Sequence, residues 1–131
     1  MLGYPGAIRG ETEFRGRVVI GAGVRLGAGV VVTIGTDGLT LIEDEAIVMN
    51  YVNVGHNARV GPCAEVGAGT VLAGWSEVGE RAQVKIGCLV RNRVRVGAGA
   101  VVGMGSVVVR DVPEGARVMG HPARPTVAAI P

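Results

Sequence analysis

The chain has 131 residues, a net charge of +2 and only 3% aromatic residues. That length suits a single domain. The scarcity of aromatic side chains argues against a surface that stacks nucleic-acid bases, so we expect no nucleic-acid partner. No basic segment followed by an apolar one begins the sequence, and no run of about 18 apolar residues occurs in it. We therefore expect neither a signal peptide nor a membrane span.

Residues 1–7 are predicted to form an irregular lead-in. A first block of a six-residue repeat follows, with its apolar places at Ile8, Phe14, Ile20, Leu26 and Val32. The next such place comes ten residues later, so four extra residues must bulge out of the repeat. The turn-forming sequence at 36–38 (Thr-Asp-Gly) is where we expect the bulge. Insertions of this kind in repeat proteins often serve binding, although a plain loop is an equal alternative.

A strict period of six then runs from Ile42 to Val112. The first place of each hexad is a branched aliphatic residue, the fifth is small or β-branched, and the second is often glycine, which would allow turns with positive φ. The first places are Ile42, Val48, Val54, Val60, Val66, Leu72, Val78, Val84, Val90, Val96, Val102 and Val108. The fifth places are Ala46, Val52, Ala58, Ala64, Thr70, Ser76, Ala82, Cys88, Val94, Ala100, Ser106 and Val112.

A period of six fits no helix face, because an α-helix has about 3.6 residues per turn. It fits a short strand followed by a tight corner, and three hexads then make one triangular coil of eighteen residues. Such coils stack as parallel strands about 4.8 Å apart. We therefore predict an all-β protein, a parallel β-helix of about six triangular coils over residues 8–113. Pro113 ends the repeat because proline cannot donate to a strand ladder, and residues 114–131 are predicted to be an irregular tail that packs back on the β-helix.

The two cysteines, Cys63 and Cys88, are too few for a disulfide framework and form no metal-binding pair. This favours a reducing, cytoplasmic location. Cys88 occupies an inward place of the repeat and is interpreted as a core residue. Cys63 faces outward, where a nucleophilic role is conceivable, but a free cysteine more often behaves as a small hydrophobic residue.

Residues eighteen places apart lie above one another in such a coil, so the sequence predicts what each face carries. One face stacks the charged residues Arg59, Glu77 and Arg95, which are interpreted as a solvated ladder worth little energy. Another face is an outward apolar strip, which a monomer seldom exposes. We expect this strip to be a subunit interface in a closed ring. The strip consists of Asn53, Val71, Leu89 and Val107.

His56 follows the strip at the next corner, with Gly74, Asn92 and Arg110 stacked above it. In a groove between two subunits, His56 would line the wall, and the glycine above it would let a ligand approach the backbone. Imidazole is the side chain best suited to proton transfer near neutral pH. Spacing alone leaves open whether His56 is a base or a surface histidine without a role. The basic side chains of residues 81–131 could receive phosphate groups.

Three stretches carry a family resemblance: 52–61 (VNVGHNARVG), 71–87 (VLAGWSEVGERAQVKIG) and 94–124 (VRVGAGAVVGMGSVVVRDVPEGARVMGHPAR). With a histidine after Val-Gly and the closing patterns DVP-x-G and G-x-PAR, they resemble the acyltransferase domain of the hexapeptide-repeat superfamily. The nearest group is the bacterial sugar O- and N-acetyltransferases related to sialic-acid O-acetyltransferase and to the bacillosamine-pathway N-acetyltransferase.

The resemblance implies a left-handed β-helix, a homotrimer, and acetyl-CoA bound between neighbouring subunits, with no metal. It implies acetyl transfer to a hydroxyl or amine of a sugar or a similar small polar acceptor, with His56 as general base. Gly74 and Gly103 match glycines along the CoA path, and a backbone amide near Gly74 suits the oxyanion. Arg110, in the basic half of the chain, is expected to contact the cofactor.

The sequence departs from the family pattern at Asn57, where relatives often have an acidic residue. Asn57 can orient the imidazole but cannot stabilise its charged form as a carboxylate does, and Glu43, Asp44 or Glu45 could take that part. Close relatives also carry an N-terminal nucleotide-sugar domain that does not precede the repeat here, so the chain is either a free-standing enzyme or a fragment. His121 is expected to be structural.

Two alternatives remain at this stage. A non-catalytic β-helix scaffold or a degenerate acyltransferase would accommodate Asn57. A γ-type carbonic anhydrase is built on the same prism, but its zinc site needs three histidines and this chain has two.

Overall fold

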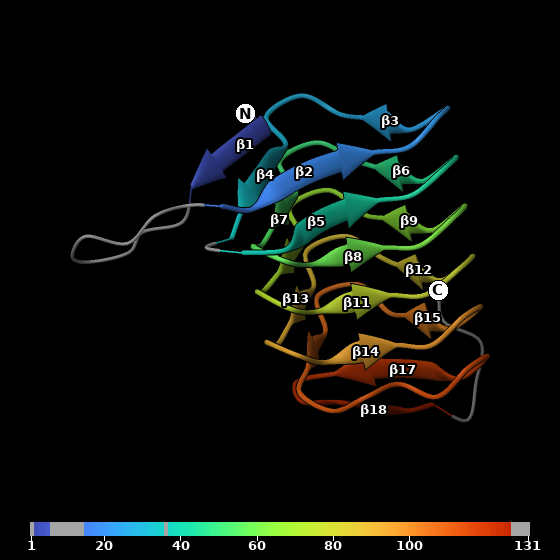
Figure 1. Cartoon of the computed structure of the whole chain (residues 1–131). Coiled ribbons are helices and arrows are strands. Elements are labelled where there is room, and N and C mark those ends of the chain that lie inside the picture. The colour runs from blue at the N-terminus through green and yellow to red at the C-terminus, as the bar shows by residue number, and fades with distance from the viewer. Residues whose placement is uncertain (1, 6–14, 36, 127–131) are drawn as a thin grey trace.

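The computed structural model describes residues 2–5, 15–35 and 37–126. Within these ranges all regular structure is β-strand, and no helix there is long and apolar enough to cross a membrane. The strands form three sheets that make the three sides of a prism, and successive coils of the prism add strands in parallel, with β18 (Ala123–Pro125) the exception (Figure 1). The predicted all-β helix of about six coils is confirmed.

The strands of each sheet follow one another along the prism. Sheet A contains β1 (Leu2–Pro5), β4 (Val31–Ile34), β7 (Asn53–Val54), β10 (Val71–Leu72), β13 (Leu89–Val90) and β16 (Val107–Val108). Sheet B contains β2 (Arg17–Ile20), β5 (Leu39–Ile42), β8 (Arg59–Val60), β11 (Glu77–Val78) and β14 (Arg95–Val96). Sheet C contains β3 (Arg25–Leu26), β6 (Ile47–Val48), β9 (Glu65–Val66), β12 (Gln83–Val84), β15 (Val101–Val102), β17 (Arg117–Gly120) and β18 (Ala123–Pro125).

The register of the sheets follows the repeat. Between the first and last coils, paired residues lie eighteen apart, as for Val54 with Leu72 and Leu72 with Val90. In the last coil the separation is sixteen, as for Val102 with Val118. All twelve predicted aliphatic places are at most 1% exposed, and all twelve small places are at most 4% exposed. The core is therefore a column one aliphatic layer wide, which explains why so few aromatic residues occur.

The glycines at the second place of the hexads serve close packing and not the turn conformation that we expected. A Cβ added to Gly55 would lie 2.5 Å from the Leu72 carbonyl oxygen, and one added to Gly61 would lie 2.8 Å from the Glu80 nitrogen. The positive φ angles occur two residues later, and seven of the residues that adopt them are not glycine. These seven are Glu45, Tyr51, Asn57, Cys63, Trp75, Arg81 and Arg93.

The extra residues of the first coil lie between β4 and β5, where the turn signal places them. Pairs across that coil are consequently twenty-two residues apart, as for Val31 with Asn53. Ile8 and Phe14, the first two places of the predicted repeat, lie outside the described residues.

Both ends of the prism are more regular than the sequence suggested. The expected irregular lead-in contains β1, which pairs in parallel with β4 and covers the end of sheet A. Beyond Pro113, β17 continues sheet C in parallel with β15, and β18 then turns back antiparallel to β17. The backbone groups at the edges of a sheet need partners, and these strands supply them. The exact division of the chain at residues 8 and 113 stays a prediction.

A pair of matched substitutions tests the core. We expect Ile42→Val to lower the free energy of unfolding by about 0.5–1.5 kcal/mol, because it removes a methyl group from a closed interior. Ile86→Val makes the same change at a side chain that is 56% exposed, and it should stay within about 0.5 kcal/mol of the parent. Urea unfolding of both variants measures this, and equal losses would contradict the inward assignment.

Candidate active site

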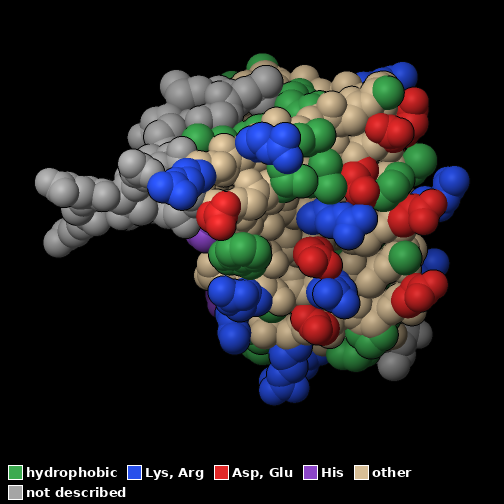
Figure 2. Space-filling view, viewed as in Figure 1, with side chains coloured by type: hydrophobic (Ala, Val, Ile, Leu, Met, Phe, Trp, Pro, Cys, Tyr) green, Lys and Arg blue, Asp and Glu red, His purple; other side chains and the backbone are tan. Residues whose placement is uncertain are grey.

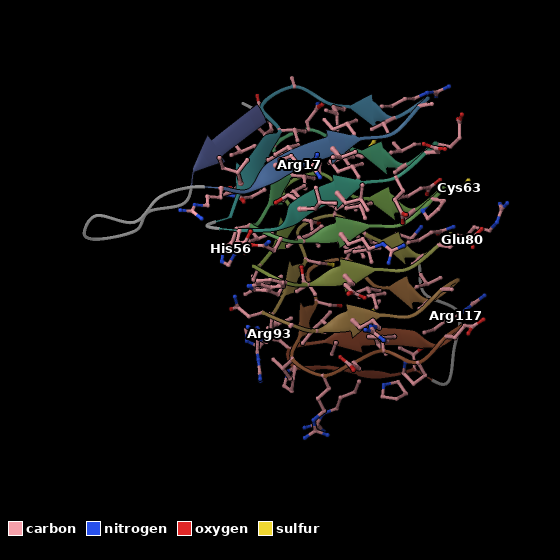
Figure 3. The ribbon with its side chains drawn as sticks, in the orientation of Figure 1. Arg17, His56, Cys63, Glu80, Arg93 and Arg117 are labelled. Atoms are coloured by element: carbon pink, nitrogen blue, oxygen red, sulfur yellow. The ribbon has the colours of Figure 1, made fainter. Side chains whose placement is uncertain are left out.

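His56 lies where sheet A passes to sheet B, at the corner between β7 and β8. We call the turns after β7, β10, β13 and β16 the A–B corner, and they comprise residues 55–58, 73–76, 91–94 and 109–111. Figure 3 shows His56 and Arg93 along this edge, and Cys63 and Glu80 along the opposite edge of the prism. In Figure 2 a histidine is visible at the rim of the molecule beside hydrophobic and basic side chains.

The imidazole of His56 lies directly over Gly74 of the next coil. A Cβ on Gly74 would collide with Nε2 and Cε1 of the ring, so the imidazole keeps this position only above a glycine. The Trp75 N–H donates to the His56 carbonyl oxygen at 3.0 Å, and the Asn92 amide donates to the Gly74 carbonyl oxygen at 3.3 Å. The predicted stack of His56, Gly74 and Asn92 is thus present.

Asn57 joins the imidazole to the loop between β4 and β5. Its Oδ1 lies 3.2 Å from Nδ1 of His56, and its Nδ2 donates to the Asp37 carbonyl oxygen at 2.5 Å. Its backbone N–H donates to Oγ1 of Thr40 at 2.8 Å. Asn57 is 9% exposed, which is low for an amide side chain at a corner, and its hydrogen bonds account for that burial.

The carboxylates that could have replaced an acidic partner lie elsewhere. Glu43 and Asp44 follow β5, at the corner that leads to sheet C. Glu43 pairs with Arg59 at 3.0 Å, and Asp44 accepts a hydrogen bond from the Ala22 N–H at 2.9 Å. The partner of the imidazole in this structure is therefore the neutral amide of Asn57.

Trp75 lies beside the imidazole and Arg93 lies against Trp75, and we predicted neither contact. The Trp75 ring lies edge-on to His56, with centroids 6.5 Å apart and planes at 88°. The guanidinium carbon of Arg93 lies 5.2 Å from the Trp75 ring centroid, a cation–π arrangement. The signal was available, because Trp75 and Arg93 stand eighteen and thirty-six residues after Asn57 and so share its place in the corner.

The predicted cofactor residues do not all lie together. Gly74 and the exposed Arg110 belong to the A–B corner with His56. Gly103 follows β15 at a different corner, where an added Cβ would lie 2.7 Å from Cε of Met119. Its carbonyl oxygen accepts hydrogen bonds from Cys88 at 3.1 Å and Ser106 at 2.6 Å, so Gly103 belongs to the packing of the prism end.

The described surface includes two hollows whose linings do not contain His56. A groove of about 640 Å³ runs along sheet C and the corner after it, and its lining includes Met49, Ile86 and Met104. A shallower hollow of about 320 Å³ lies on sheet B among the charged residues Glu43, Arg59, Glu77 and Arg95. Figure 2 shows the alternating positive and negative side chains of this face. In the single chain the imidazole therefore lies at a corner of the prism, outside both of these hollows.

The other potentially reactive groups are less well placed. Cys88 is buried in the core, as expected, and burial raises the pKa of its thiol. Cys63 is half-buried and free, at the corner between sheets B and C. Over residues 2–5, 15–35 and 37–126, no three His, Cys, Asp or Glu side chains lie close enough together to hold a metal ion.

The chain is similar to known acyltransferases in sequence and in structure. It is 36% identical over 110 residues to the UDP-3-O-acylglucosamine N-acyltransferase of Caulobacter sp. (strain K31), a match that covers 84% of this chain and 32% of that protein. PerB from Caulobacter crescentus, solved in complex with CoA and GDP-perosamine, is 38% identical with a TM-score of 0.67, over 83% of this chain and 54% of that one. No family model matches the sequence.

The chain belongs to the hexapeptide-repeat acyltransferase superfamily. The UDP-N-acetylglucosamine acyltransferase of Francisella novicida superimposes with a TM-score of 0.88 at 25% identity, over 95% of this chain and 47% of that one. The predicted family and its left-handed β-helix are thereby confirmed. The chain spans 32% to 54% of the length of these three proteins.

Proposed function

We propose that this hexapeptide-repeat chain transfers an acetyl group from acetyl-CoA to a hydroxyl or amine of a sugar or a similar small polar acceptor, with His56 as general base. The observation that carries the proposal is the geometry of the imidazole. Its Nδ1 is held by Asn57, and its Nε2 lies over Gly74, where a side chain would otherwise stand.

The chemistry follows from that arrangement. The free lone pair of Nε2 takes the proton of the acceptor as its oxygen or nitrogen attacks the thioester carbonyl. The tetrahedral intermediate then expels the CoA thiolate, which recovers the proton as a thiol. A general base contributes roughly 10²–10⁴-fold, and holding both substrates together contributes much of the rest. Because the Trp75 N–H is occupied by the His56 carbonyl oxygen, we assign the oxyanion contact to the N–H of Gly74.

The cofactor would lie along the A–B corner. Arg91, Arg93 and Arg110 are exposed there in successive turns, and guanidinium groups bind phosphates well because they donate two hydrogen bonds at once. The structure of PerB with CoA supports a CoA ligand for this fold.

A second subunit would complete the site. His56 lies at a corner outside the two hollows described above, whereas ligand sites are normally concave. The adjoining face of sheet A exposes Val71 and Leu89 at 40% and 41%, an apolar surface beside the imidazole. We propose that this face packs against a sister chain in a homotrimer, so that the groove between them contains His56.

Replacing the base tests the reaction. We expect His56→Ala to lower kcat by about 10²–10⁴-fold, because the acceptor loses its proton acceptor, while calorimetry still detects CoA binding. His121→Gln is the matched control, since it removes the other histidine of the chain, and it should keep full turnover. The measurement is CoA release with a panel of amino- and hydroxy-sugars, free and nucleotide-linked.

Retained turnover in His56→Ala would refute the base role. A parent protein that binds no CoA would instead favour the non-catalytic scaffold.

The assembly is tested separately by light scattering. We expect a mass of three times the 13.3 kDa chain. Leu89→Arg places a charge on the apolar face of sheet A and should reduce that mass, because an unpaired charge is costly to bury. Arg95→Glu changes a charge on sheet B and should leave the mass unchanged. A monomeric parent protein at micromolar concentration would contradict the trimer.

A further inference from the structure

We propose that the loop between β4 and β5 selects which ring nitrogen of His56 carries the proton, acting through Asn57. The catalytic consequence rests on the proposed function. The proton position itself is a property of the folded chain and can be measured without any substrate.

The extra residues of the first coil bring a backbone carbonyl to the Asn57 side chain. Asp37 accepts the hydrogen bond from Nδ2 of Asn57 at 2.5 Å. The Asp37 carboxylate is turned to its own loop, where it accepts from the Gly38 N–H at 2.9 Å. Gly35 packs against the same amide so closely that a Cβ there would overlap its oxygen. The loop therefore contacts Asn57 on more than one side.

The Asp37 carbonyl fixes the orientation of the amide. A carbonyl oxygen can only accept a hydrogen bond, so the NH₂ end of Asn57 must face Asp37 and Oδ1 must face the imidazole. Oδ1 also only accepts, and it lies 3.2 Å from Nδ1 of His56. The hydrogen must then be on Nδ1. A neutral imidazole has one N–H, so Nε2, the nitrogen over Gly74, keeps the lone pair.

Thr40 holds the backbone of Asn57 in place for this contact. Its hydroxyl donates to the Thr33 carbonyl oxygen at 2.7 Å, and its Oγ1 accepts from the Asn57 N–H at 2.8 Å. Thr40 is fully buried, so both bonds are shielded from water. Asn57 has a φ of 59°, a conformation that asparagine tolerates better than most residues. The two threonines belong to β4 and β5, the strands on either side of the loop.

The same geometry explains why an asparagine follows the histidine here. An ionised aspartate would have no hydrogen to offer the Asp37 carbonyl, and two acceptor oxygens would then face each other at 2.5 Å. The amide satisfies both neighbours at once, since it donates to Asp37 and accepts from His56. The insertion and the departure from the family pattern are thus one device that positions the base.

The ¹⁵N chemical shifts of the histidine rings test the inference directly, at a pH where imidazole is neutral. The chain has two histidines, and His121→Gln assigns the signals of His56. We expect a protonated Nδ1 and an unprotonated Nε2 in the parent protein. Asn57→Gly keeps the positive φ, which glycine adopts freely, but removes the amide, and it should move the proton toward Nε2.

Arg81→Gly is the matched control. Arg81 occupies the same turn position at the next corner, with a φ of 58°, and its replacement should leave the His56 spectrum unchanged. Thr40→Val should shift the spectrum in the same direction as Asn57→Gly, and Thr40→Ser, which keeps the hydroxyl, should restore it. Should Thr40→Val fail to fold, the Asn57→Gly spectrum still decides.

The kinetic constants kcat and KM distinguish a role of Asn57 in positioning the His56 ring from a role in binding acetyl-CoA. We expect Asn57→Gly to lower kcat about 10- to 100-fold, a part of what a general base contributes, with the KM for acetyl-CoA unchanged. A parent spectrum with the proton on Nε2, or a spectrum that Asn57→Gly leaves unchanged, would overturn the inference. Absence of acetyl transfer by the parent protein would overturn the proposed function and the catalytic role, while the spectrum would still decide the proton position.

Discussion

The parallel ladder with an eighteen-residue register is the constraint on which the rest of this structure depends. Each coil contributes one aliphatic side chain per sheet to a narrow interior, and every inward place from Ile42 to Val112 is closed to solvent. Side chains that bind a ligand or react with it must therefore lie on the outer surface of the prism, for example at its corners. The register also stacks equivalent corner residues above one another, which is how His56 comes to lie over a glycine and beside a tryptophan.

Most of the fold could be predicted because the period of six directly encodes that ladder. Counting residues in sixes and eighteens predicts the twelve buried aliphatic places and the corner that holds His56. It also predicts the charged face of Arg59, Glu77 and Arg95. The period could not show why the second-place residues are glycine, since the reason is the backbone of the next coil. It also could not show that β1 and β17 extend the sheets at the two ends, because neither follows the hexad pattern.

The candidate site was only partly predictable for the same reason. The stack of His56 over Gly74 is a matter of register, but the bond from Asn57 to Asp37 crosses the first coil, where the eighteen-residue register is broken. The residues of a loop outside the repeat cannot be assigned to a face of the prism from their sequence positions. Their contacts are therefore known only from the structure. Gly103 shows a second contact that counting along the repeat does not reveal. Its match to a family glycine suggested the cofactor path, which stays a prediction, and in the structure it packs against Met119.

Together these features describe a half-buried histidine at a corner of the prism whose partner is a neutral amide, and we propose that this histidine acts as the base. The central claim is that the acyl thioester meets His56 at the A–B corner. A crystal structure of the assembled protein with CoA tests it most directly. The account predicts the CoA sulfur within about 4 Å of Nε2 of His56, a distance at which the reacting groups can meet. CoA bound in the groove of sheet C, with its sulfur far from any His56, would contradict it.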